Sequence, residues 1–221
     1  MRQKEKMRFI LDHLAEMFPD AHCELHHTNP FELTIAVLLS AQCTDETVNK
    51  VTPRLFAKYK KPEDYLAVPL TELEQDIRRI GLYRNKAKNI QRLCHMLLDK
   101  YGGEIPRQRE QLMELPGVGR KTANVVLANA FGVPTIAVDT HVERVTKRLG
   151  LVPADAPVLA VEQKLLSVVP ENEWITTHHR LIFFGRYHCK AVNPQCASCP
   201  LIAICPEGKR RMKTAAKRKS K

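Results

Sequence analysis

Four cysteines near the C-terminal end of the chain carry the clearest signal for metal chemistry. They are spaced C-x6-C-x2-C-x5-C and are Cys189, Cys196, Cys199 and Cys205. One C-x2-C couple flanked by single cysteines suits either a zinc ion or an iron–sulfur cluster, and four unligated cysteines are the plainer alternative. The total of seven cysteines is odd, and the N-terminus has no apolar signal core. Both features argue against a disulfide framework and indicate a protein of a reducing compartment.

A lysine at the start of an expected helix is the second chemical candidate. Lys121 is predicted to lie in the first helical turn, beside Arg120. The positive end of the helix dipole and the charge of Arg120 both favour a neutral amine. A neutral amine can attack a carbonyl-like carbon and form a Schiff base. A lysine here can equally contact a phosphate, and the residues alone leave both roles open.

The segment before this lysine predicts a tight turn between two helices. Within Leu115–Ala123 (LPGVGRKTA), Pro116 and Gly117 favour the turn, and Gly119 lets another molecule approach the backbone. The N–H groups at the turn and at the helix start suit a phosphate. The pattern is that of a helix–hairpin–helix, which grips nucleic-acid backbone without reading bases. A plain helix–turn–helix corner is the alternative.

A carboxylate follows the apolar segment Thr135–Val138. Thr140 and Glu143 fit a capping box, which would leave Asp139 spare beside the start of a helix. A spare carboxylate could accept an amine proton or stabilise a cationic sugar. The alternative is that Asp139 is itself the helix cap.

The elements that must position these residues are predicted to be helices almost throughout. Apolar residues recur at helical spacing in 7–18, 31–42, 70–80, 83–101, 158–169 and 174–187. Strand alternation is weak and no repeat is evident, so the fold class is all-α. The longest apolar stretch, Thr34–Ala41, is far shorter than the ~20 residues of a membrane span. The 221 residues allow two lobes, although composition marks no boundary.

The positive charge is concentrated at the C-terminal end. The chain has 35 Lys and Arg against 24 Asp and Glu, a net charge of +11. Residues 209–221 contain eight of the basic residues and no acid, so the rest of the chain carries only +3. We expect 209–221 to be a disordered basic tail, which serves either solubility or the binding of phosphate.

Taken together and in order, these motifs resemble the endonuclease III family of DNA glycosylases with lyase activity. The resemblance covers about residues 5–207 and rests on five segments. They are Leu38–Asp45, Ile80–Tyr83 with Lys86 and Ala87, Leu115–Ala123, Val138–Val142 and the four cysteines.

The resemblance implies two helical lobes with a DNA-binding cleft between them. One is a six-helix barrel over residues 22–132, with the helix–hairpin–helix at about 108–130. The other joins 1–21 to 133–208 and holds a 4Fe-4S iron–sulfur cluster on the four cysteines. The implied partner is double-stranded DNA with damaged pyrimidines or abasic sites. The family also implies a monomer with no membrane partner, located in the cytoplasm and associated with the nucleoid.

The resemblance also assigns roles to individual residues. It makes Lys121 the nucleophile and Asp139 its catalytic partner, and it places Gln42 and Leu82 where side chains enter the duplex. Further DNA-contacting residues would be Gly117, Gly119, Arg120, His141, Asp45 and Lys190. One departure concerns the loop between Cys189 and Cys196, where the family often has several basic residues and this chain has only Lys190.

The implied reaction is base excision followed by strand cleavage. Lys121 attacks the sugar C1′ as an oxidised pyrimidine leaves, and β-elimination then breaks the strand on the 3′ side. An adenine-type monofunctional glycosylase of the same fold is disfavoured because such enzymes lack a lysine at the position of Lys121. A non-catalytic iron–sulfur DNA-binding protein is the remaining alternative, and it is disfavoured because both Lys121 and Asp139 are present.

Overall fold

The computed structural model describes residues 2–219, and every regular element in this range is helical. This confirms the all-α class. Met1, at the start of the predicted second lobe, and Ser220 and Lys221 of the predicted tail lie outside the described residues. None of the helices in the described range combines the length and apolar character that crossing a membrane requires.

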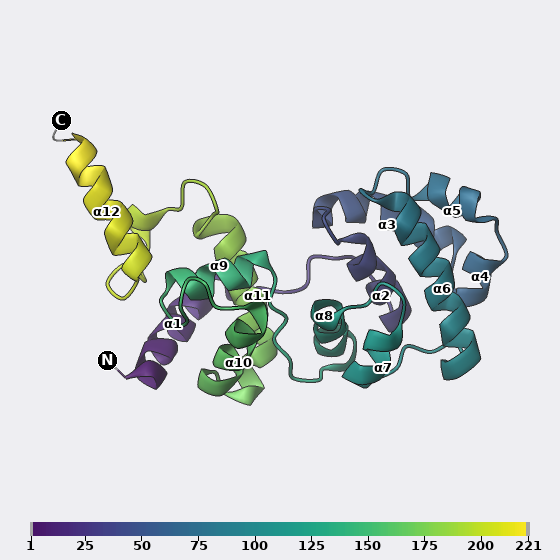
Figure 1. Ribbon diagram of the computed structural model, residues 1–221, viewed down its shortest axis with the longest axis horizontal. Helices are drawn as coiled ribbons and strands as arrows, with labels where there is room; N and C mark the ends of the chain where they lie inside the picture. The colour runs from purple at the N-terminus through teal and green to yellow at the C-terminus, as the bar shows by residue number, and fades with distance from the viewer. Residues whose placement is uncertain (1, 220–221) are drawn as a thin grey trace. The chain divides into compact units, whose positions relative to one another are not determined.

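The chain divides into two compact units (Figure 1). One unit is Cys23–Val133. It contains α2 (Pro30–Leu39), α3 (Asp45–Lys58), α4 (Pro62–Leu66), α5 (Leu70–Asp76), α6 (Tyr83–Tyr101), α7 (Arg109–Glu114) and α8 (Arg120–Phe131). The other unit joins Met1–His22 to Pro134–Lys221. It contains α1 (Gln3–Met17), α9 (Thr140–Arg148), α10 (Val158–Val168), α11 (Trp174–Phe183) and α12 (Pro206–Lys219).

Helix α2 is the central helix of the unit Cys23–Val133. The side chains of Phe31 and of every residue from Leu33 to Leu39 are buried, as the nearly unbroken apolar sequence predicts. Pro30 occupies the first helical position, and the Asn29 side chain caps the helix by accepting a hydrogen bond from the Glu32 N–H at 2.9 Å. Helix α2 packs against α8, which carries Arg120 and Lys121, and against α6, whose N-cap residue is Leu82.

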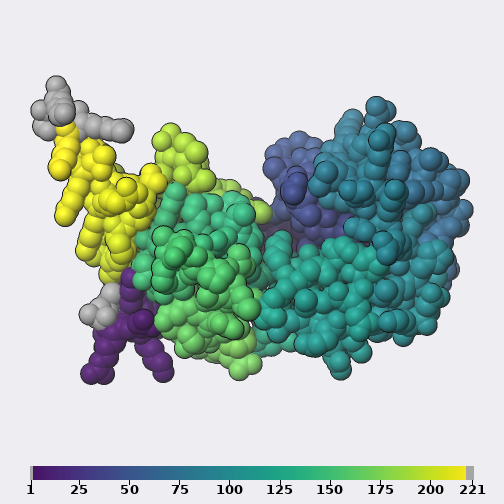
Figure 2. Space-filling model, viewed as in Figure 1, coloured from purple at the N-terminus to yellow at the C-terminus, as the bar shows by residue number. Residues whose placement is uncertain are grey.

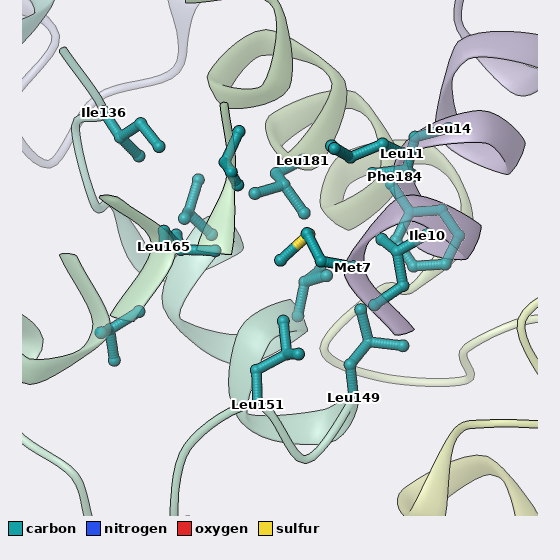
Figure 3. Packing of buried hydrophobic residues seen from close by; sticks show 14 of the residues in the cluster. Met7, Ile10, Leu11, Leu14, Ile136, Leu149, Leu151, Leu165, Leu181 and Phe184 are labelled. Atoms are coloured by element: carbon teal, nitrogen blue, oxygen red, sulfur yellow. The ribbon is translucent and has the colours of Figure 1, made fainter. Parts of the chain in front are cut away.

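The N-terminal helix α1 is built into the core of the other unit. Its buried residues Met7, Ile10, Leu11 and Leu14 lie on one face, at helical spacing. Figure 3 shows these side chains packed among residues that follow them by more than a hundred positions, including Leu149, Leu181 and Phe184. Full burial of each large apolar side chain contributes about 1.5–3 kcal/mol, so α1 stabilises the core that it shares with α10 and α11.

The basic C-terminal segment differs from the disordered tail that the sequence predicts, because α12 continues to Lys219. Pro206 stands at the start of the helix, and the Glu207 carboxylate pairs with Arg210 at 2.8 Å and with Arg211 at 2.6 Å. The residues after Gly208 include strong helix formers such as Ala, Lys, Arg and Met. Every side chain from Met212 to Lys217 is exposed, and Figure 2 shows this segment in yellow at the surface of its unit.

Candidate functional site

The hairpin places Lys121 as the sequence predicts, in the first turn of α8. Gly119 is the N-cap residue, Arg120 is the first helical residue, and the Lys121 side chain is exposed. No side chain caps this helix start. The N–H groups of the first turn therefore remain suited to a ligand such as a phosphate.

The turn before α8 is held by close packing inside its unit. Leu115 and Val118 are buried, and the Val118 N–H donates to the Leu115 carbonyl at 3.0 Å. Gly117 has φ +84°, and a Cβ there would lie 3.0 Å from Leu38 Cδ1 and 3.1 Å from Asn89 Nδ2. A glycine is thus required both by the left-handed backbone and by the contacts with α2 and α6.

Two exposed residues of the same unit share an unusual backbone conformation. Gln42 has φ 55° and Leu82 has φ 59°, although neither is glycine. Leu82 is 56% exposed and is the N-cap residue of α6. The two loops are adjacent, since a Cβ added to Gly81 would lie 3.6 Å from the Gln42 carbonyl oxygen. Strained backbone of this kind is often found at functional sites, and these are the two positions for which the sequence predicts entry into the duplex.

The helix predicted over residues 31–42 ends earlier than the sequence predicts. The apolar run extends to residue 42, but α2 ends at Leu39, and residues 40–43 form a turn in which the Cys43 N–H donates to the Ser40 carbonyl at 3.0 Å. Asp45 follows as the first residue of α3 and is half-buried.

Asp139 is the N-cap of α9, and the predicted Thr140–Glu143 capping box is wrong. Asp139 Oδ1 accepts hydrogen bonds from the backbone N–H of His141 at 2.9 Å and of Val142 at 2.8 Å. Residue 139 is extended (φ −98°, ψ −176°), so Thr140 becomes the first helical residue. Glu143 instead pairs with Lys147 at 2.6 Å. Because a single oxygen serves both N–H groups, the cap does not use Oδ2.

His141 lies half-buried next to this cap. A Cβ added to Gly185, in the π-helical segment η2 (Phe184–His188), would lie only 2.8 Å from His141 Cβ, so the two segments are in close contact. His141 Nδ1 is 3.3 Å from Arg144 Nη2. Burial lowers the pKa of His141 and the nearby Arg144 and Arg186 lower it further, against the opposing effect of Asp139. The neutral imidazole is favoured.

The four C-terminal cysteines line one cavity. All four are half-buried and free of disulfides, and the cavity is also lined by residues such as Arg148, Phe184 and His188. Across the described residues, no set of three or more His, Cys, Asp or Glu side chains is arranged to hold a metal ion. The structure thus brings the four predicted cysteines to one place.

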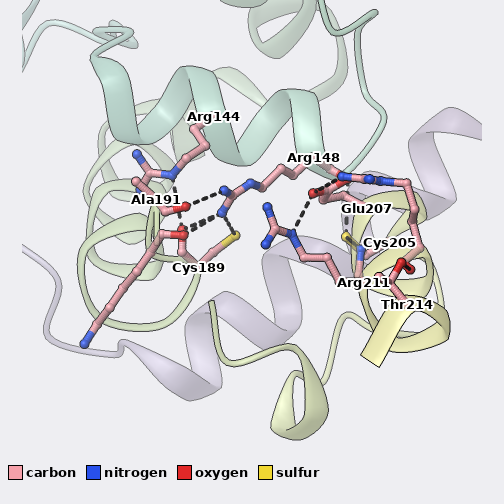
Figure 4. Close-up of polar contacts among 11 residues, drawn as sticks. Arg144, Arg148, Cys189, Ala191, Cys205, Glu207, Arg211 and Thr214 are labelled. Carbon is pink, nitrogen blue, oxygen red and sulfur yellow. Dashed lines mark hydrogen bonds and ion pairs between the residues drawn. The ribbon is translucent and has the colours of Figure 1, made fainter. Parts of the chain in front are cut away.

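Two arginines of α9 hold the loop that begins at Cys189 (Figure 4). Arg148 Nη1 donates to the Lys190 carbonyl at 2.6 Å and lies 3.5 Å from Cys189 Sγ, and its Nη2 donates to the Ala191 carbonyl at 3.0 Å. Arg144 Nε donates to the Cys189 carbonyl at 3.2 Å. Helix α9 therefore connects the Asp139 cap at its start with the cysteine loop at its end.

The cysteine cavity fits a thiolate-bound group in its donor chemistry. The Gly208 N–H lies 3.2 Å from Cys205 Sγ, and the Arg148 guanidinium lies beside Cys189 Sγ. Hydrogen bonds to sulfur and nearby positive charge both favour thiolate. Burial, together with the neighbouring cysteines, raises the pKa of Cys199 to about 11, against a hydrogen bond with the Leu201 backbone, and the positive charge of a bound metal would favour its thiolate form.

The candidate residues are distributed over both units. Lys121 lies in the unit Cys23–Val133. The same unit contains the predicted DNA contacts Gln42, Asp45, Leu82, Gly117, Gly119 and Arg120. Asp139, His141, the cysteines and the exposed Lys190 lie in the other unit. The paired histidines His178 and His179, which the sequence places at a surface with metal binding disfavoured, are both buried on α11.

Sequence reasoning missed a role for Lys86. It appears in the sequence only as part of the motif that contains Ala87, yet its side chain is 5% exposed and its ammonium donates to two backbone carbonyls. The available signal was a lysine within the apolar stripe of residues 83–101, on the face that is expected to be buried.

Comparison with known proteins identifies clear relatives. The family model described as "HhH-GPD superfamily base excision DNA repair protein" matches residues 35–171. The endonuclease III of Bacillus subtilis is 64% identical over 213 residues, which cover 96% of this chain and 97% of the relative. The endonuclease III of Escherichia coli K12 is 48% identical, covering 91% of this chain and 95% of that protein. A solved structure of a trapped endonuclease III–DNA covalent intermediate, in an estranged-adenine complex, matches with a TM-score of 0.94 and 69% identity, over 96% of this chain and 100% of the other.

Proposed function

The chain belongs to the HhH-GPD superfamily of base excision DNA repair proteins and, within it, to the endonuclease III family, and from this membership we propose that it is a bifunctional DNA glycosylase and AP lyase. Its substrates are oxidised pyrimidines in duplex DNA and the abasic site itself. The observation that carries the proposal is the exposed Lys121 at the uncapped start of α8, in a chain similar to a protein trapped as a covalent intermediate with DNA.

Lys121 supplies the nucleophile. Its amine attacks the sugar C1′ while the bond from C1′ to the base breaks, and the base leaves with the electron pair and takes up a proton. Loss of the amine proton and opening of the sugar ring give an imine between Lys121 and C1′. The imine acidifies the C2′ proton, and its removal expels the 3′ phosphate by β-elimination. The first step uses the amine in its neutral form, which is the nucleophile.

Asp139 assists through the oxygen that the helix cap leaves available. Oδ1 is committed to the N–H groups of His141 and Val142, so its orientation is fixed. Oδ2 can then stabilise the positive charge that develops on the sugar or accept the amine proton. The cap therefore positions the carboxylate instead of competing with its chemical role.

The remaining predicted residues hold the DNA. The turn residues Gly117 and Gly119, with Arg120, contact the phosphates, while Gln42 and Leu82 fill the space that an extruded base leaves. Asp45, His141 and Lys190 contribute further contacts. We propose a monomer that works on nucleoid DNA.

The cofactor of this proposal is a 4Fe-4S cluster held by Cys189, Cys196, Cys199 and Cys205. When bound, such a cluster cross-links the thiolates of a short loop segment and supplies positive charge to them. The chain's own residues Arg144 and Arg148 anchor the start of that loop on α9. The role of the cluster is structural.

One gel experiment tests the proposed function. A duplex with a single abasic site is incubated with the wild type, with Lys121→Ala and with the control Lys88→Ala, which removes an exposed lysine of α6. We expect the wild type and the control to nick the strand and Lys121→Ala to be inactive. Nicking by Lys121→Ala at the wild-type rate would refute Lys121 as the nucleophile. A panel of single-lesion duplexes then identifies the preferred base.

A further inference from the structure

Lys86 is a buried lysine that makes two hydrogen bonds to backbone. It lies in the first turns of α6 and is 5% exposed. Its Nζ donates to the Leu39 carbonyl at 2.9 Å and to the Ala41 carbonyl at 2.6 Å. Because a buried ammonium is costly unless it is hydrogen-bonded, these two bonds fix where the side chain can lie.

The two carbonyls belong to the end of α2 and to the turn that carries Gln42. Leu39 is the last residue of α2, and Ala41 immediately precedes Gln42. The ammonium thus lies at the negative end of the α2 dipole and holds the peptide next to the left-handed Gln42.

The backbone of the same residue is bonded to the second loop. The Lys86 N–H donates to the Leu82 carbonyl at 3.1 Å, which forms the first hydrogen bond of α6. Lys86 is therefore bonded to both loops, by its side chain to the Ala41 carbonyl that precedes Gln42 and by its backbone to the Leu82 carbonyl. The 3.6 Å approach of a Cβ at Gly81 to the Gln42 carbonyl shows that the two loops also touch directly.

The left-handed conformation at these two positions needs such support. A non-glycine residue with φ near +55° is disfavoured and persists only where its surroundings hold it. The two residues are exposed, so their own side chains provide little packing. Burial lowers the pKa of Lys86, with the Cys43 thiol acting in the opposite direction, and this desolvation strengthens the hydrogen bonds that the ammonium makes.

We propose that Lys86 is a positioning residue that holds Gln42 and Leu82 together in the arrangement with which they enter the duplex. This rests on the proposed function, in which both residues fill the space of an extruded base. A lysine that only capped α2 would leave Leu82 and base extrusion unaffected when it is removed.

The test uses Lys86→Met, which keeps the length of the side chain and removes the donor, with Lys88→Met as the matched exposed control. Single-turnover excision of a paired lesion should fall by about 10- to 100-fold in Lys86→Met, since a small misplacement of a positioning group has this effect. Cleavage of a preformed abasic site should change much less, because no base has to be extruded there. The control should match the wild type in both assays. Equal losses in the two assays would overturn the proposal.

A double-mutant cycle separates positioning from a general loss of stability. In a Gln42→Ala, Leu82→Ala background, Lys86→Met should cause no further loss of lesion excision, because its effect acts through those two residues. An undiminished further loss would overturn the proposal. If Lys86→Met does not fold, as judged by circular dichroism, Lys86→Gln takes its place in the same cycle with the same two outcomes.

A binding measurement tests the proposal without relying on the excision reaction. The probe is a duplex with 2-aminopurine opposite a tetrahydrofuran abasic analogue, bound by proteins that all carry Lys121→Gln. Insertion of Gln42 and Leu82 should unstack the 2-aminopurine and raise its fluorescence, and Lys86→Met should reduce this rise at saturating protein. An unchanged rise would contradict the role of Lys86, whereas failure of the wild type to nick abasic DNA would contradict only the proposed function.

Discussion

In the proposed mechanism, Asp139 has two roles that depend on different oxygens of its carboxylate. Oδ1 accepts from the N–H groups of His141 and Val142 and so caps α9. The proposed chemistry uses Oδ2. The sequence leaves two caps open, Thr140 in a capping box with Glu143 and Asp139 itself. The extended backbone at residue 139 makes Asp139 the cap. A local sequence pattern does not reveal that backbone angle.

Substitution of Asp139 should separate the cap from the chemistry. Asn caps a helix about as well as Asp, so Asp139→Asn should keep the wild-type midpoint of urea unfolding. Its base excision in single turnover should fall by about 10²- to 10⁴-fold, the range of a positioned acid–base group. Asp139→Ala should lose activity and also about 1 kcal/mol of unfolding free energy. Full activity in Asp139→Asn would mean that Asp139 is only the cap.

At the scale of elements, the sequence predicts helices well and their ends less well. Periodicity places α6 and α10 within a residue of their observed ends, because one face of each is apolar. The apolar run at 31–42 extends past the end of α2. The turn after Leu39 is held by hydrogen bonds from Lys86, which lies on a helix far away in the sequence. The site motifs are recognisable one by one, but the closeness of the Gln42 and Leu82 loops is a tertiary contact that spacing cannot show.

Helix α12 should contribute to DNA binding through charge alone. Deletion of residues 209–221 removes eight basic residues and leaves the cysteine loop intact. The slope of log affinity for undamaged duplex against log salt should become shallower, by about 0.9 for each phosphate that the shortened chain no longer neutralises. Single-turnover nicking of abasic DNA should persist. A slope equal to that of the full chain would show that this segment serves solubility only.

At the scale of the whole molecule, the residues of the proposed chemistry are divided between the two compact units. The unit Cys23–Val133 contains Lys121, and the other contains Asp139. In the second unit, α9 joins Asp139 at its start to Arg148 at its end, and Arg148 holds the loop that begins at Cys189. Through α9, the ordering of the loop that begins at Cys189 is linked to the position of the Asp139 carboxylate.

The cluster should accordingly be a structural requirement. Purified protein should be yellow-brown, with iron and sulfide each near four per chain, the composition of a cubane. Removal of the iron by a chelator should lower the thermal unfolding midpoint, because ligand binding to the folded state stabilises it. A colourless, active preparation with one zinc per chain would refute the iron–sulfur assignment.

Covalent trapping with borohydride tests the central claim, that Lys121 forms an imine with the sugar. With wild type and an abasic duplex, borohydride should reduce the imine and leave protein and DNA permanently joined on a denaturing gel. Lys121→Gln should give no such product while binding the duplex, because the turn of Gly117 and Gly119 still contacts phosphate, and the control Lys88→Gln should trap like the wild type. Trapping of Lys121→Gln at the wild-type rate would contradict the account, since another amine would then be the nucleophile.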